Sequence, residues 1–415
     1  SYYVCNYYEY YGYYYIDIND CRDPRMTYAQ SNNIERSSTE VRISSNNESG
    51  FNWVLGAFQE TNEKVTDVDY LQPGGSYYSS GLSGTWWEAD LDRKGEIQAI
   101  FGEAYIDIGD KTQLTVGFRN YDQDMDLTAS NGYYGDMSFG ITNQKFKSSE
   151  SGTIPKVNIK HNISDDLMVY GTYSEGFRPS GVNRLRPSDP APKTYDADYL
   201  ESLELGFKST IGDGKLVMNG AFYSMDWKDY QTTTYDLSLV AVAFVDNVGN
   251  AEITGIELNM VYAIDDTTSL TYYYNGVDST LSEDYYQNNV LYATSGNRLS
   301  YMPETSAYIS LDKDYTLAGR SAYMNLDYSY TGDRYNSYEN GAILLPSYGL
   351  ANFRTGVDFN NTSLEFYINN LLDKDAYLSR YNDFEGVGSS GYAGFGIRRT
   401  GSKPRVIGIR FRYRY

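Results

Sequence analysis

The segment RVIGIRFRYRY, from Arg405 to Tyr415, alternates apolar and mostly basic residues along its length. Successive side chains of a β-strand point to opposite faces of the sheet. One face would carry Ile407, Ile409, Phe411, Tyr413 and Tyr415, and the other Gly408, Arg410, Arg412 and Arg414. A soluble sheet would have to bury one face, and burying three arginines would be very costly. The segment therefore predicts a strand of a transmembrane barrel, with the arginines facing the lumen and the other set facing lipid.

Several other segments alternate in the same way. They lie at Glu201–Ser209, Ile256–Tyr262, Ala322–Tyr330 and Leu364–Asn369. In Ile256–Tyr262, for example, Ile256, Leu258 and Met260 fall on one face, opposite Glu257 and Asn259. Strict alternation over four to eight residues indicates a half-buried strand.

The predicted connections come in two sizes that alternate along the chain. Short polar turns are expected at 46–50, 109–112, 164–166, 211–214, 265–268, 312–319 and 360–363. Long loops rich in Gly, Ser, Asn, Asp and Tyr are expected at roughly 67–95, 122–152, 176–199, 227–250, 277–302, 333–346 and 373–404. Short turns at one end and long loops at the other are typical of transmembrane barrels. We predict an all-β, antiparallel, up-and-down barrel with about 16 strands in this chain.

Composition excludes several other classes of protein. The 415 residues include 46 Tyr and 38 Gly and carry a net charge of −21, which disfavours nucleic acid as a partner. No stretch approaches the 18 or so apolar residues of a transmembrane helix. A mean hydropathy of −0.55 is compatible with a barrel, because barrel strands are apolar only at alternate positions.

Several motifs resemble the barrel of TonB-dependent outer-membrane receptors. They include STEVRISSNNESGFNWVLGAF from Ser38, VYGTYSEGFRPSGVN from Val169, NVGNAEITGIELNM from Asn247 and YINNLLDKDAY from Tyr367. The aromatic residue at Tyr415 is similar to the usual ending of such barrels. The resemblance covers roughly residues 36 to 415.

The resemblance implies a barrel of twenty-two strands, an N-terminal plug domain and a TonB box. We expect this chain to contain neither a plug domain nor a TonB box, and about six strands fewer than twenty-two. We expect a fragment of a longer receptor rather than a relative that has shed these parts. The first residue is Ser1, with no secretory signal, so a signal has been removed or the chain starts late.

Residues 1–34 are predicted to form a Tyr-rich strand and an external loop, followed by the receptor-like barrel at 35–415. Cys5 and Cys21 are the only cysteines and bracket this Tyr-rich segment. In an oxidising compartment they could form a disulfide, although two cysteines alone are a weak signal.

Candidate functional residues are few. Arg178 in EGFRPSG and Asn247 and Asn250 in the receptor-like segment are candidates for binding a ligand, with a wall ion pair and turn formation as the respective alternatives. Asp122, Asp124 and Asp126 alternate in a predicted loop and are a weak calcium candidate, because Leu127 and Tyr133 stand where an EF-hand needs Gly and Glu.

No catalytic residues and no resident cofactor are predicted. His161 is the only histidine, and a surface or lumen position is expected for it. The leading hypothesis is therefore a non-enzymatic receptor in the bacterial outer membrane, in contact with lipid and lipopolysaccharide. The resemblance implies import of a small-molecule ligand, such as a ferric siderophore, driven by the TonB complex through the plug. The alternatives are a passive porin or structural barrel and, less favoured, a soluble all-β adhesion or carbohydrate-binding protein.

Overall fold

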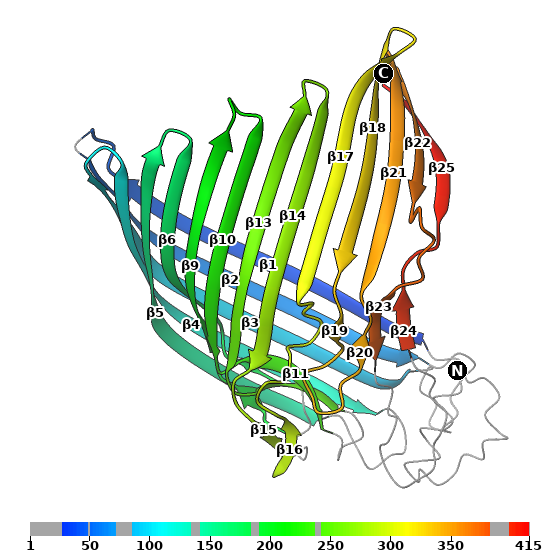
Figure 1. Ribbon diagram of the computed structural model, residues 1–415. Coiled ribbons are helices and arrows are strands. Elements are labelled where there is room, and N and C mark those ends of the chain that lie inside the picture. The colour runs from blue at the N-terminus through cyan, green and yellow to red at the C-terminus, as the bar shows by residue number, and fades with distance from the viewer. Residues whose placement is uncertain are drawn as a thin grey trace, which may run out of the picture.

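The computed structural model describes residues 27–48, 50–71, 85–133, 142–183, 191–236, 242–381 and 398–414. Fifteen antiparallel strands form one curved sheet in which neighbours follow chain order (Figure 1). These strands are β1 (Thr27–Ser44), β2 (Phe51–Leu71), β3 (Thr85–Ile108), β4 (Thr112–Tyr133), β5 (Thr142–Ser164), β6 (Leu167–Arg178), β9 (Asp198–Ile211), β10 (Leu216–Lys228), β13 (Ala251–Asp265), β14 (Thr268–Leu281), β17 (Thr305–Leu317), β18 (Arg320–Thr331), β21 (Tyr348–Phe359), β22 (Thr362–Asn369) and β25 (Val406–Tyr413).

The all-β, up-and-down prediction is confirmed. Fifteen of the roughly sixteen expected strands are present, and the predicted Tyr-rich strand before them lies outside the described residues. β1 begins at Thr27, inside the segment 1–34 that was predicted as strand and loop.

All seven predicted short turns join consecutive strands at one end of the sheet, the upper end in Figure 1. The turn between β17 and β18 contains only Ala318 and Gly319, with φ of 51° and 74°. Positive φ at both central residues is the type I′ geometry, whose twist matches that of the flanking strands. The long connections lie at the opposite end.

Two predicted long loops are wrong in extent. The segments 67–95 and 122–152 are largely strand, because β2 runs to Leu71, β3 starts at Thr85, β4 runs to Tyr133 and β5 starts at Thr142. β3 has 24 residues, whereas about 9–11 suffice to cross a bilayer. The surplus stands beyond the membrane, where neither face needs apolar residues, so its composition is like that of a loop.

The outer face of the sheet carries a band of exposed, large apolar side chains. Among them are Val41, Ile43, Leu55, Ile100, Phe118, Leu205, Phe222, Ile256, Leu326, Phe366, Ile407 and Ile409. Such a continuous apolar surface requires lipid. The opposite face is polar and lines the lumen, with residues such as Glu60, Glu103, Lys156, Glu204, Asp327 and Glu365. Across the described ranges, the model contains no helix that is long and apolar enough to span a bilayer.

Short pairs of strands lie within the long connections, at that end of the sheet. They are β7 (Gly181–Val182) with β8 (Thr194–Tyr195), β11 (Gln231–Asp236) with β12 (Val242–Asn247), β15 (Tyr285–Gln287) with β16 (Val290–Ala293), β19 (Arg334–Tyr335) with β20 (Leu344–Leu345), and β23 (Tyr377–Tyr381) with β24 (Arg398–Gly401). The largest buried apolar cluster lies here, and joins Tyr223 and Ile253 of the sheet to Tyr285 and Tyr338 of the connections. The connections therefore pack onto the lumen face.

Candidate functional site

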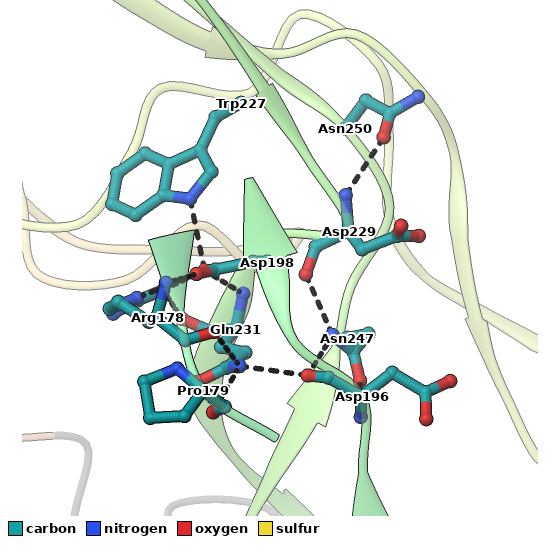
Figure 2. A network of polar contacts seen from close by, with 9 residues as sticks. All are labelled: Arg178, Pro179, Asp196, Asp198, Trp227, Asp229, Gln231, Asn247 and Asn250. Carbon is teal, nitrogen blue, oxygen red and sulfur yellow. Dashed lines mark hydrogen bonds and ion pairs between the residues drawn. The ribbon is translucent and has the colours of Figure 1, made fainter. Parts of the chain in front are cut away.

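A buried carboxylate organises the rim where β6 ends and β9 begins. Asp198 is only 1% exposed, and Arg178 Nε donates to both of its oxygens at 3.0 Å (Figure 2). Trp227 Nε1 donates to Asp198 Oδ2 at 2.9 Å, and the Gln231 backbone N–H donates to the same oxygen at 3.0 Å. The Arg178 guanidinium also lies 4.7 Å from the Trp227 ring centroid. The carboxylate, at the start of β9, thus joins the ends of β6 and β10 to the start of β11.

A second set of contacts continues from this carboxylate through the connections. Gln231 Nε2 donates to the carbonyls of Pro179 and Asp196 at 3.0 and 2.7 Å. Asn247 Nδ2 donates to the carbonyls of Asp196 and Asp229 at 3.0 and 2.7 Å, and Asn247 Oδ1 accepts from the Asp196 N–H at 2.8 Å (Figure 2).

Asn250 extends this set of contacts to a turn. Its Oδ1 accepts from the Asp229 N–H at 3.0 Å, and its Nδ2 donates to Glu283 Oε1 at 2.5 Å. Asp229 has a φ of 54°, so the amide of Asn250 holds a left-handed residue in place.

The three residues that the sequence singled out as ligand candidates thus come together in one network. Arg178, Asn247 and Asn250 all contact other parts of the chain, and a role for them in binding a ligand stays a prediction. Sequence reasoning missed Asp198, Trp227 and Gln231. Their roles depend on contacts between residues that lie far apart in the chain. We define the nine residues of Figure 2 as the rim network.

A second carboxylate at the rim is Glu150. Its Oε1 accepts from the hydroxyl of Tyr199 at 2.5 Å, and its Oε2 accepts from the Ser180 N–H at 3.1 Å. Phe177 stacks on Tyr121 with ring centroids 3.8 Å apart, and on Tyr199 with centroids 6.4 Å apart. No sequence motif indicated this cluster.

A groove of about 420 Å³ lies on the lumen face of β13, β14, β17 and β18. Its lumen-facing lining includes Glu257, Asn259, Tyr273, Asn275 and Tyr308. The rings of Tyr273 and Tyr308 are 5.9 Å apart, and Glu257 makes no hydrogen bond or ion pair with any residue that the structure describes. The groove offers aromatic faces and a free carboxylate to a solute in the lumen.

The arginines of the last strand face the same side as polar side chains of β22. Arg410 Nη1 lies 2.7 Å from Glu365 Oε1, and the Arg410 guanidinium lies 5.5 Å from the Tyr367 ring centroid. Arg412 is the Cα partner of Ser363 on that face, and the Arg414 N–H donates to the Asn361 carbonyl at 2.7 Å. The structure places Ile407, Ile409, Phe411 and Tyr413 on the other face, all more than half exposed. Tyr415, Cys5 and Cys21 lie outside the described residues.

The three aspartates of the calcium prediction do not form a loop. Asp122, Asp124 and Asp126 lie in β4, on its exposed outer face, and Asp126 pairs with Lys147 at 2.9 Å. Their placement in a loop was wrong, because β4 continues beyond the apolar band. Within the described ranges, no three His, Cys, Asp or Glu side chains are grouped to hold a metal ion. His161 lies in β5, with its Nδ1 2.8 Å from Thr112 Oγ1.

The apolar outer band, the polar inner face and the short turns at one end are those of the wall of a transmembrane β-barrel, of which fifteen described strands, from β1 to β25, form one open sheet. Residues 2–371 match the family model described as TonB dependent receptor-like, beta-barrel. The chain belongs to the TonB-dependent receptor family, as its motifs predicted.

The curated relatives with similar sequences are named as receptors. The metal-pseudopaline receptor CntO of Pseudomonas aeruginosa is 23% identical over 273 residues, which are 65% of this chain and 36% of that receptor. The pesticin receptor of Yersinia enterocolitica is 23% identical over 62% of this chain and 35% of its own length. The chain therefore spans about a third of the length of these relatives.

Solved structures of the family have the same fold. The ferric yersiniabactin uptake receptor FyuA from Yersinia pestis has a TM-score of 0.74 at 16% identity, over 94% of this chain and 55% of that one. The ferric-catecholate import receptor Fiu from E. coli K12, in its closed form, has a TM-score of 0.66 at 16% identity, over 92% and 54%.

Proposed function

We propose that this protein is the barrel of a receptor that imports a metal chelate across the outer membrane, with a ferric siderophore or similar iron complex as its ligand. The observation that carries the proposal is family membership over residues 2–371. Two of the similar proteins, FyuA and Fiu, are named for ferric-chelate uptake, which supports iron as the first metal to test.

The geometry is compatible with a receptor that binds its cargo without covalent chemistry. The rim network and the buried cluster around Tyr285 brace the connections at the outer end of the sheet. Specificity would then come from surfaces that are held in place before the ligand arrives, which lowers the entropic cost of binding. The groove with Tyr273 and Tyr308 supplies aromatic faces within the lumen, where a planar chelate could stack.

In this proposal, a plug domain fills the lumen and links the barrel to the TonB complex, whose energy displaces the plug. Import would therefore depend on TonB, whereas a passive porin would conduct without it. This difference separates the two functions predicted from the sequence.

The experiment is uptake of radioactive iron chelates by cells that contain or lack the protein, each with and without TonB. The expected result is uptake that needs both the protein and TonB, together with slower growth of cells lacking the protein under iron limitation. Uptake that persists without TonB would favour the porin. If removing the protein changes neither uptake nor growth for any chelate tested, iron import is wrong.

A further inference from the structure

Two basic side chains lie directly opposite each other on the lumen face of the sheet. Lys64 of β2 and Arg93 of β3 are Cα partners, and both are half-buried. They share the face of Glu60, which is four positions from Lys64 along β2. Residues paired in this way have Cβ atoms about 4.5–5.5 Å apart, and like charges there repel each other. The pair therefore favours an anion between its two cationic groups.

The two cations lack a partner in the part of the chain that the structure describes. Neither Lys64 nor Arg93 makes a hydrogen bond or an ion pair there. The carboxylates next to them in the sequence, Glu63 and Asp92, point to the opposite, outer face, because side chains alternate along a strand. On that face Glu63 is paired with Lys94 at 2.7 Å.

The flanking positions on the lumen face are neutral. Asn62 and Gly95 form the row of partners on one side of the pair, and Thr66 and Leu91 form the row on the other. The only carboxylate on this face of β2 is Glu60, and an arginine of β1 already binds it at 2.6 Å. The positive charge of the pair is therefore not neutralised from within the wall.

Gly95 leaves open space beside the pair. A Cβ on Gly95 would meet nothing nearer than the Asn62 carbonyl, at 3.9 Å. Asn62 is exposed, and its side-chain amide makes no hydrogen bond within the described ranges. Three donors thus surround a position without a side chain: the amide of Asn62, the ammonium of Lys64 and the guanidinium of Arg93.

This space belongs to the vestibule, by which we mean the part of the lumen beyond the apolar band. Lys64 lies nine positions beyond Leu55 of that band, about 30 Å along the strand, on the side of the long connections. Leu127, the Cα partner of Arg93 on β4, belongs to a buried apolar cluster that anchors the wall here. A solute that enters from outside would meet the pair before it reaches the membrane-spanning part of the lumen.

We propose that Asn62, Lys64 and Arg93 form an anion-binding site that holds an anionic oxygen of the imported chelate in the vestibule. The inference rests on the proposed function and adds a substrate class, namely chelates with a net negative charge rather than neutral ones. Guanidinium and ammonium groups bind such oxygens through charge-assisted hydrogen bonds. The anion would also screen Lys64 and Arg93 from each other, so both cations should contribute to its binding.

Calorimetric titration of the detergent-purified protein with three probes tests this site. The probes are metal-free citrate, a trianionic ferric tris-catecholate and a neutral ferric tris-hydroxamate. At low ionic strength the tris-catecholate is expected to bind about tenfold more tightly than the tris-hydroxamate, the factor that about 1.4 kcal/mol supplies. Because salt screens charges, this preference should shrink as the ionic strength rises.

Two substitutions and a matched control locate the site. Lys64→Gln and Arg93→Gln should each weaken binding of citrate and of the tris-catecholate about tenfold, and should leave binding of the tris-hydroxamate unchanged. Lys94→Gln removes the same charge one residue from Arg93, but on the outer face, and should leave the affinity for all three probes as it is.

The stability of the ligand-free variants separates a binding role from a structural one. Arg93→Gln should unfold at the temperature of the parent protein or above it, because the substitution removes a repulsion. A marked loss of stability, equal effects of Arg93→Gln and Lys94→Gln on citrate binding, or equal affinity for the two ferric complexes would overturn the proposal. If citrate binding needs Lys64 and Arg93 while neither ferric complex binds, the anion site stands and the proposed iron import fails instead.

Discussion

Arg178 Nε lies 3.0 Å from both carboxylate oxygens of Asp198, at the point where β6 ends and β9 begins. The two partners are unequal, because the Asp198 side chain is 1% exposed and that of Arg178 is 47% exposed. Arg178 can recover water if the pair breaks, whereas the backbone N–H of the buried Gln231, which also donates to Asp198, cannot. The carboxylate is therefore the member on which the stability of the rim depends.

Replacing Asp198 with Ala should destabilise the outer end of the barrel by about 2–4 kcal/mol. The substitution removes the acceptor for Trp227 Nε1 and leaves the buried Gln231 N–H without its partner. Thermal unfolding and limited proteolysis of the connections would measure the effect. Asp196→Ala is the control, because Asp196 is exposed and enters the rim network through its backbone. Equal effects of the two changes would contradict this role for Asp198.

Gly255, in the receptor-like motif that starts at Asn247, accommodates the side chain of Tyr223. A Cβ on Gly255 would lie 2.3 Å from the Tyr223 hydroxyl and 2.7 Å from the Gly276 carbonyl. Gly255→Ala should therefore displace Tyr223 from Asn275, to which it donates at 3.0 Å, and cost about 1–3 kcal/mol.

The matched control for this change is Gly176→Ala in β6. A Cβ there meets nothing within 4 Å, and its φ is not in the left-handed region. Thermal unfolding of both variants gives the comparison. A Gly255→Ala protein as stable as Gly176→Ala would mean that Tyr223 can move aside without loss.

Asp265 caps the turn between β13 and β14 at the rim opposite the long connections. The pKa of Asp265 is lowered from 3.8 to about 2, mainly because its carboxylate accepts hydrogen bonds from the hydroxyl and N–H of Thr267. A pKa lower in the folded state means that the charged form stabilises the fold. This stabilisation is present above about pH 4 and is lost as the pH falls through about 2.

Carbon NMR of the labelled carboxyl groups would measure this titration directly. Asp265→Asn should be less stable than the parent protein at neutral pH, and the difference should vanish near pH 2. Thr267→Val removes the hydroxyl but keeps the backbone donor, so the pKa of Asp265 should rise only part of the way toward 3.8. A midpoint near 3.8 in the parent protein would contradict the turn geometry.

The sequence was sufficient for the strand order and for the places of the seven short turns, although most of the turn expected at 312–319 belongs to β17, which runs to Leu317. Alternation along strands such as Ile256–Tyr262 is created by lipid on one face and water on the other, so the pattern is visible without a structure. The pattern fails at Asp122–Asp126, because β4 there stands beyond the bilayer and water lies outside it too. Loop-like composition then hides a strand.

The rim network was only partly predictable. Arg178, Asn247 and Asn250 lie in recognisable motifs, but Asp198 is one of many acidic residues near predicted loops. Its importance comes from the pairing of β6 with β9, in which Arg178 and Asp198 are Cα partners. A single sequence carries no direct record of that pairing.

The assignment of the two faces of β25 to lipid and lumen can be tested by adding a charge to one face and, in a second variant, removing a charge from the other. Ile409 is 70% exposed and shares the apolar face with Phe366, its Cα partner, whereas Arg412 shares the polar face with Ser363. An arginine on the lipid face of a barrel costs about 2–4 kcal/mol at the centre of the bilayer and less near its borders. Ile409→Arg should therefore lower the free energy of unfolding in lipid vesicles, whereas Arg412→Gln should change it by less than about 0.5 kcal/mol, as expected for an exposed site. An Ile409→Arg protein as stable as the parent, together with a gain in stability from Arg412→Gln, would reverse the assignment of lumen and lipid, since an arginine is costly only on the lipid face.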